Sequence, residues 1–415
     1  MRVMFTVSDI TAHYFPMVPL GWAVQAAGHE LRVVCAPGQS ERITGAGLTP
    51  VPVLTDIDIF LLTRFYFLWQ TLDGNVPAGT WLPPMDPETG AELDRIEDYD
   101  FSALAQRMLA SEPPKTEQRI DAMVDFARSW RPDLIVHDSL QLDAVVAARV
   151  TGVPAVMHLT GPTGTAETEW GAQIVPSQFS PAYQRHGIAD PGAGLIEHVI
   201  DLCPPSMAPP TDAVRHPLRP VPYNGSGGLP AELLTWSRSR RRPRIAIVWS
   251  STMVKLHGWT AFPVRMLALA AAKLDVDVVV TVDAQSRARL GTLPDSVRVL
   301  EQCPLNMLLE HCEVVVHHGG HGSTMTAVAA GVPQLMVTYS PEHTICAKRL
   351  VPTGAARWLY GPYCQQEDVT AALAALLTET VHRDSARQLR AEAMAQPSPV
   401  ELVTELADLA ATPVS

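Results

Sequence analysis

The strongest constraint on the fold is an alternation of short β-branched runs with longer helical patterns, which recurs in both halves of the chain. Such alternation is typical of parallel sheets that are covered by helices on both faces. The runs that we predict as strands are residues 3–7, 30–35, 134–137 and 153–159, followed by 245–249, 276–282, 297–300, 314–316 and 335–338. The predicted helices are residues 19–27, 142–150, 263–273, 322–330, 369–377 and 401–411.

The length of the chain predicts two domains, and the alternating pattern predicts that each is a doubly wound α/β domain. A chain of 415 residues exceeds one ordinary core, and 47% hydrophobic residues suffice for two interiors. We expect domains at residues 1–212 and 241–395, a Pro- and Gly-rich linker at 213–240, and a last helix within 396–415 that is a candidate to cross back to the N-terminal domain. Two facing sheets of this kind direct the carboxyl ends of their strands to a shared cleft, where ligands bind.

The composition excludes several classes of protein. The formal net charge of −12 argues against binding to nucleic acid or to an anionic membrane surface. No apolar stretch approaches 18 residues, and the first apolar run is too short for a signal peptide, so we expect no membrane span and a cytoplasmic protein. The six cysteines are scattered without a C-x-x-C pair, which favours reduced core thiols over a zinc or redox site.

A block rich in glycine and histidine lies between the strand at 314–316 and the helix at 322–330. It reads His317-His318-Gly319-Gly320-His321-Gly322-Ser323-Thr324. Glycines allow a ligand to approach the backbone closely, and the free amides and dipole of a helix start favour an anion. With an imidazole at His318 and the two hydroxyls, this block predicts a diphosphate site. It is not a P-loop, because no Gly-Lys-Ser/Thr follows, and Met325 stands where a dinucleotide fingerprint has its third glycine.

Two other interpretations of this block stay open. A metal could bind His317, His318 and His321, although the glycines interrupt the helical spacing and no glutamate base follows. The block could also be a plain turn between a strand and a helix.

Residues 302–356 resemble the signature of family 1 glycosyltransferases, and most closely the actinomycete enzymes that decorate macrolide and aromatic polyketide antibiotics. The resemblance is carried by Gln302-Cys303-Pro304-Leu305, by residues 317–324, 330–335 and 354–356, and towards the N-terminus by residues 18–23, 26–34 and 223–225. It extends over nearly the whole chain. It implies a GT-B fold, in which two facing Rossmann-like domains bind the acceptor (N-terminal) and the nucleotide sugar (C-terminal).

The same resemblance implies the residues that hold the donor. The diphosphate would be bound by His318, Gly320, Gly322, Ser323, Thr324, Ser251 and Thr252; the nucleoside by Gln302, Cys303, Pro304 and Leu305; and the sugar by Glu342 and His343. Relatives usually begin the loop at 250–252 with glycine, and carry Asp followed by Gln or another polar residue at 342–343. The serines could instead cap the next helix, and residues 342–343 could be an exposed helix start. Because His318 and the helix start would neutralise the diphosphate, we expect no metal and no cofactor.

His13 and Asp138 are the predicted catalytic residues. Both follow predicted strands, so both lie on the rim of the cleft. An inverting transfer needs a base for the acceptor hydroxyl, and an acid behind a histidine stabilises its imidazolium. In the related enzymes a histidine after the first strand is the base and an aspartate at the end of a later strand pairs with it. Asp9, Asp143 and His137 are competing candidates for the role of the acid.

Aromatic side chains gather in residues 56–114, where the α/β alternation is interrupted. We predict that this insertion lines an apolar acceptor pocket, although a helical insert that only packs is an equal alternative. The candidate pocket residues are Phe60, Phe65, Phe67, Trp69 and Trp81.

The leading hypothesis is an inverting O-glycosyltransferase that moves a deoxysugar or other sugar from a dTDP- or UDP-sugar to a hydrophobic, polyketide-type aglycone. The alternatives are C-glycosylation of an aromatic ring, a non-hydrolytic sugar-nucleotide epimerase, and a non-catalytic helper homologue. The resemblance adds one candidate partner, an auxiliary activator protein that resembles a haem-less cytochrome oxidase. A homodimer is a further open expectation.

Overall fold

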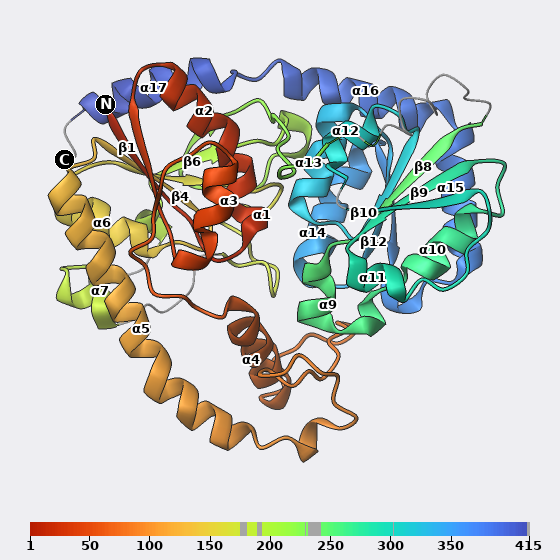
Figure 1. The fold of residues 1–415 in the computed structure, drawn as a ribbon, viewed down its shortest axis with the longest axis horizontal. Coiled ribbons are helices and arrows are strands. Elements are labelled where there is room, and N and C mark those ends of the chain that lie inside the picture. Colours follow the sequence, from red (N-terminus) through yellow and green to blue (C-terminus); the bar gives the residue numbers. More distant parts are fainter. Residues whose placement is uncertain (175–180, 189–192, 229, 231–241, 302, 413–415) are drawn as a thin grey trace.

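The computed structural model describes residues 1–174, 181–188, 193–228, 230, 242–301 and 303–412, which form two α/β domains (Figure 1). The N-terminal sheet has the parallel strand order β3-β2-β1-β4-β5-β6-β7. Its strands are β1 Arg2–Thr6, β2 Glu30–Val34, β3 Pro50–Val51, β4 Leu134–Asp138, β5 Ala155–His158, β6 His198–Asp201 and β7 Val214–Pro217. Val3 and Phe5 of β1 face the layer of α2 (Val18–Ala26), whereas Met4 faces α5 (Phe101–Trp130) and α6 (Asp143–Thr151).

The C-terminal sheet is also parallel, with the strand order β10-β9-β8-β11-β12-β13. Its strands are β8 Arg244–Val248, β9 Asp277–Val282, β10 Val297–Glu301, β11 Val314–His317, β12 Gln334–Thr338 and β13 Ala356–Tyr360. Ile245 of β8 faces α10 (Val264–Ala271) and α15 (Gln366–Thr378), and its neighbour Ala246 faces α12 (Leu305–Leu309) and α13 (His321–Ala330). Helices therefore cover both faces of each sheet, which confirms the doubly wound class.

Shorter helices complete the domains. They are α1 Thr11–Tyr14, α3 Ser40–Gly45, α7 Pro181–Arg185, α9 Ser251–His257, α11 Ala284–Ala288 and α14 Pro341–Leu350.

The structure contains four strands that the sequence pattern does not indicate: β3, β6, β7 and β13. β3 has two residues, and β6 (His-Val-Ile-Asp) and β7 (Val-Arg-His-Pro) are too short and too polar to show a β-branched run. β7 lies inside the linker expected at 213–240, so the first domain extends beyond residue 212. Of that expected linker, residues 229 and 231–240 lie outside the described residues.

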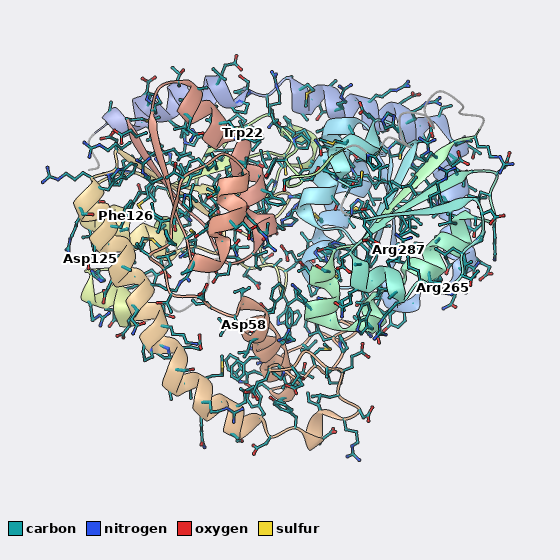
Figure 2. All side chains as sticks on the ribbon, viewed as in Figure 1. Trp22, Asp58, Asp125, Phe126, Arg265 and Arg287 are labelled. Atoms are coloured by element: carbon teal, nitrogen blue, oxygen red, sulfur yellow. The ribbon has the colours of Figure 1, made fainter. Side chains whose placement is uncertain are left out.

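The insertion at 56–114 reaches the other domain. Asp58 caps α4 (Ile59–Leu72) by accepting a hydrogen bond from the Leu61 amide, at the point where the chain leaves the N-terminal domain (Figure 2). From α4 the chain runs beside α9 of the C-terminal domain before it returns through α5 (Figure 1). Although α5 spans 30 residues, no helix in the described part of the chain is both long and apolar enough to cross a membrane.

The last two helices cross from the C-terminal domain to the N-terminal domain along one side of the molecule (Figure 1). α16 (Thr380–Met394) packs on α13, and α17 (Pro399–Ala411) packs on α2. One hydrophobic cluster includes Leu20 of α2, Met325 of α13 and Leu406 of α17, so the two domains share part of their core.

We predict that Leu406→Ala destabilises the protein by about 2–5 kcal/mol, the usual cost of removing a buried leucine side chain. Leu406 is fully buried between α17 and the N-terminal domain. The free energy of unfolding, measured by urea denaturation, provides the test. Val400→Ala on the same helix is the matched control, because Val400 is 64% exposed and its loss should change stability by less than about 0.5 kcal/mol. Equal effects of the two substitutions would contradict the docking of α17.

Candidate functional site

Two adjoining cavities lie between the domains, with volumes of about 300 Å³ and about 230 Å³. Ala12 and Thr160 of the N-terminal domain line both of them. Ser250, Gly322 and Ser323 of the C-terminal domain also line both. The cavities therefore meet at the amino-terminal end of α13. We call the first the larger cavity and the second the smaller cavity.

The turn between β11 and α13 depends on its glycines. Gly319 has a φ of 94°, a conformation that side chains disfavour. A Cβ atom on Gly320 would lie 2.5 Å from Cε1 of His318, so only glycine leaves room for this imidazole. His318 lines the smaller cavity, as do Gly320 and Gly322, and it packs edge-on against Trp249. Of the other predicted diphosphate residues, Ser323 lines the cavities, whereas Thr324 is fully buried and donates its hydroxyl to the Gly320 carbonyl.

The other histidines of the block have structural partners. Nε2 of His317 lies 2.9 Å from Oε1 of Gln334, and Nδ1 accepts a hydrogen bond from the Gly319 amide. His321 contacts two hydroxyls of the other domain, with Nδ1 2.7 Å from Thr160 Oγ1 and Nε2 3.0 Å from Thr163 Oγ1. Within the described residues, no three side chains of the metal-binding types converge on a common point.

The loop before α9 contributes to both cavities. Ser250 caps α9, its Oγ accepting a hydrogen bond from the Thr252 amide, and both residues line the smaller cavity. Ser251 was predicted to contact the diphosphate, but it is exposed and is not among the cavity residues. Ser250, which is not among the predicted diphosphate residues, lines both cavities in place of Ser251.

The larger cavity contains two of the predicted nucleoside residues. Cys303 and Leu305 line it, Pro304 stands at the start of α12 without lining it, and Gln302 lies outside the described residues. Another part of its wall comes from the expected linker at 213–240, including Tyr223 and Asn224.

This segment is held firmly against the C-terminal domain. The side chain of Asn224 donates to Thr326 Oγ1 and accepts from the Asn306 amide. The run Tyr223-Asn224-Gly225 was part of the resemblance and could have indicated this role.

His13 lies in α1, directly after β1, and lines the smaller cavity. Its Nδ1 is 3.3 Å from Oγ of Ser139. The fully buried carboxylate of Asp138 accepts hydrogen bonds from the amides of Ser8 at 2.6 Å and Leu140 at 2.8 Å. The hydrogen-bond partner of the His13 ring is therefore Ser139, a residue that the sequence did not single out, and not Asp138.

Burial lowers the pKa of His13, and the charges of Asp138 and Glu342 oppose that shift. The three competing residues are held elsewhere. Asp9 accepts from the Ile57 amide, Asp143 accepts from the Tyr183 hydroxyl, and Nδ1 of His137 lies 2.9 Å from the Asp138 carbonyl. None of the three lines either cavity.

Glu342 and His343 stand in the first turn of α14, and both line the smaller cavity. The amide of His343 donates to Oγ of Ser340, which caps the helix. The ring of His343 lies 4.7 Å from that of His318, measured between centroids. His343 is therefore next to the predicted diphosphate site. Burial raises the pKa of Glu342.

Of the five predicted aromatic residues, only Phe67 lines the smaller cavity, where Thr63 joins it. The other four have packing roles. Phe65 stacks on Phe101, Phe60 lies under Nζ of Lys255, Trp69 is 43% exposed beside Tyr66, and Trp81 packs edge-on against Tyr339. The insertion thus acts mainly as a bridge between the domains, because amphipathic aromatic spacing alone does not tell a pocket wall from a packing face.

A loop after β5 fastens the two domains together. Glu167 and Arg349 form a two-pronged ion pair with both N–O distances at 2.7 Å, and Arg349 also donates to the Pro162 carbonyl. Gly161 lies so close to His321 that a Cβ atom would come within 2.7 Å of its side chain. Because these residues are separated by more than 150 positions, no local pattern in the sequence signals the contact.

The chain matches the family described as Erythromycin biosynthesis protein CIII-like in both parts. The N-terminal domain of that family matches residues 22–66 and 102–248, and its C-terminal domain matches residues 265–409. The chain is 33% identical to the TDP-daunosamine transferase DnrS of Streptomyces peucetius, over 99% of this chain and 97% of that protein.

Two solved structures share the fold. Spinosyn forosaminyltransferase SpnP superposes with a TM-score of 0.75 at 30% identity and covers 99% of this chain and 100% of its own. Spinosyn rhamnosyltransferase SpnG, complexed with thymidine diphosphate, gives a TM-score of 0.75 at 28% identity and covers 98% and 100%. With its two-domain GT-B architecture and matches along its whole length, the chain belongs to the Erythromycin biosynthesis protein CIII-like family of actinomycete antibiotic glycosyltransferases.

Proposed function

We propose that this enzyme transfers a deoxysugar from a thymidine diphosphate sugar to a hydroxyl group of a polyketide-type aglycone, with inversion at the anomeric carbon. The observation that carries the proposal is the junction of the two cavities at the start of α13. A nucleoside in the larger cavity would direct its diphosphate to this junction and its sugar into the smaller cavity, towards His13.

The donor side fits this arrangement. Cys303 and Leu305 offer apolar contacts to a base, and the first amides of α13 with the His318 imidazole face the position of the diphosphate. Thymidine is favoured over uridine on the ground of similarity, since DnrS is named for a TDP-sugar and SpnG was solved with thymidine diphosphate. A polyketide acceptor rests on the same ground.

The acceptor side requires one proton transfer. Ser139 Oγ accepts the Nδ1 hydrogen of His13, an assignment made from the hydrogen-bond network, and this leaves the Nε2 lone pair free. Nε2 takes the proton of the acceptor hydroxyl while its oxygen attacks the anomeric carbon from the face opposite the diphosphate. The bond between the anomeric carbon and the diphosphate oxygen breaks, and the diphosphate leaves with the electron pair. Asp138 and Glu342 stabilise the resulting imidazolium by their charge.

The geometry bears on the alternative of C-glycosylation. An aspartate that activates a phenol needs a free carboxylate oxygen in the cavity, but both oxygens of Asp138 accept backbone amides and the residue is fully buried. Asp138 is therefore a poor base for either product, and His13, which lines the cavity, is the base in the proposed O-glycosylation.

Thermal-shift measurements with nucleoside diphosphates, followed by turnover assays, test the proposed function. We expect TDP to raise the melting temperature, by the linkage between binding and stability, and ADP to leave it unchanged. Mass spectrometry should then detect glycosylated product from a TDP-deoxysugar and a panel of polyketide aglycones, with and without EDTA. Loss of product in EDTA would contradict the proposal that His318 and the start of α13 bind the diphosphate without a metal ion. Turnover by the purified chain alone would show that the enzyme does not require an auxiliary activator protein.

We predict that Gly320→Ala weakens TDP binding by at least about tenfold. The new Cβ displaces His318, and loss of one hydrogen bond to a charged group costs about 1.5–3 kcal/mol. Isothermal titration calorimetry measures the change. Gly45→Ala in α3 is the matched control, because no atom lies within 4 Å of its added Cβ and the site is remote. Wild-type affinity in a folded Gly320→Ala protein would contradict the role of His318.

We predict that His13→Gln lowers kcat by about 10²–10⁴-fold, the usual contribution of a general base. Because the pKa of His13 is lowered from the ordinary 6.5, the neutral imidazole predominates at pH 7. Wild-type activity should therefore be close to its plateau at pH 7 and should fall at acid pH, as His13 becomes protonated. A profile that rises between pH 7 and pH 9 would point to another base.

A further inference from the structure

The cleft presents a problem of charge. The diphosphate of a sugar nucleotide carries two negative charges, yet no lysine or arginine is among the described residues that line the two cavities. Arg349 is engaged by Glu167, and Lys255 points towards the ring of Phe60. The start of α13 supplies only partial positive charge. Among the side chains that line the two cavities, only an imidazole can supply a full positive charge near the diphosphate.

Four imidazoles of the C-terminal domain line the smaller cavity, and two of them are poor candidates. Both ring nitrogens of His321 are engaged in the hydrogen bonds described above. His257 is buried between the rings of Phe67 and Trp81, and burial lowers its pKa to about 4. His318 and His343 remain, and Nδ1 of each is buried without a hydrogen-bond partner.

We propose that donor binding is coupled to the uptake of one proton by His343, whose imidazolium then neutralises the diphosphate beside a neutral His318. This proposal rests on the proposed function, because it concerns the same diphosphate. It assigns His343 to the phosphates, where the resemblance had implied the sugar.

One observation favours His343 over His318 as the site of the charge. His318 is only 5% exposed and is enclosed by Gly320 and Trp249, whereas His343 is half-buried at the cavity wall and is the less enclosed of the two. With the rings 4.7 Å apart, two imidazolium charges would repel each other, so the pair takes up one proton.

The empty site keeps His343 neutral. Burial and the neighbouring imidazoles of His318, His321, His257 and His317 hold its pKa well below the usual range. The remaining ionisable groups of this cavity are Glu342 on the same helix, which lies 3.5 Å from His321, and His13 on the opposite domain. A bound diphosphate raises the pKa of His343, because an opposite charge within a few ångströms favours the protonated form of an imidazole.

The consequence is a donor affinity that depends on pH. While the free site is neutral and the bound site is protonated, uptake of one proton weakens binding about tenfold for each unit of rising pH. Above the pKa of the bound imidazolium, the dependence disappears. The turnover that depends on His13 changes in the opposite direction, since it is expected to fall as the pH drops.

Calorimetry with TDP-glucose between pH 5.5 and pH 8.5, in buffers that differ in ionisation enthalpy, tests the proposal. TDP-glucose is the suitable probe because its diphosphate is esterified at both ends and lacks the terminal ionisation near pH 6 that free TDP has. We expect the wild type to take up close to one proton per donor at the lower pH values. His343→Gln should abolish this uptake, weaken binding at pH 6, and bind as the wild type does at pH 8.5.

His186→Gln is the matched control, because His186 contacts Asp121 on the surface away from the cleft and should leave proton uptake unchanged. Absence of proton uptake in the wild type, wild-type uptake in His343→Gln, or equal weakening by that substitution at every pH would overturn the proposal. Failure of both TDP-glucose and TDP to bind at any pH would instead contradict the proposed function.

Discussion

The close approach of backbone and imidazole in the turn from β11 to α13 is the constraint on which the site depends. Gly319 supplies the left-handed conformation, and Gly320 leaves the space that His318 occupies. The turn brings the free amides of α13 to the point where the two cavities meet. The geometry of this turn is thus set by two residues without side chains.

The same helix start also joins the domains. His321 is the first residue of α13 and contacts Thr160 and Thr163 of the N-terminal domain, while the ion pair of Glu167 and Arg349 lies one helix further on. A ligand at this helix start therefore lies next to the contacts that fix the width of the cleft. The helix start that lines both cavities and the contacts that join the domains are therefore neighbours in the structure.

Much of the fold could be predicted from the sequence, because long β-branched strands such as β1, β9 and β12 carry their own periodic signal. The short edge strands β6 and β7 lack that signal, since their pairing depends on neighbours already in place. The residues of the candidate site also divide into those with a signal in the sequence and those without one. His13 and His318 were singled out because they follow predicted strands, Glu342 and His343 were implied by the family resemblance, and all four line one cavity. Ser139 and Tyr223 were missed because their roles depend on contacts between distant parts of the chain.

The crossing of α17 to the first domain has a consequence for engineering. A cut in the segment after β7 would leave the amino-terminal half without the helix that covers α2 and would expose the apolar side chains Leu20 and Val24. The two catalytic modules are therefore not the two halves of the sequence. A functional chimera with a relative should exchange residues from about β8 to the end of α16 as an internal cassette, and keep α17 from the parent that supplies the amino-terminal sheet.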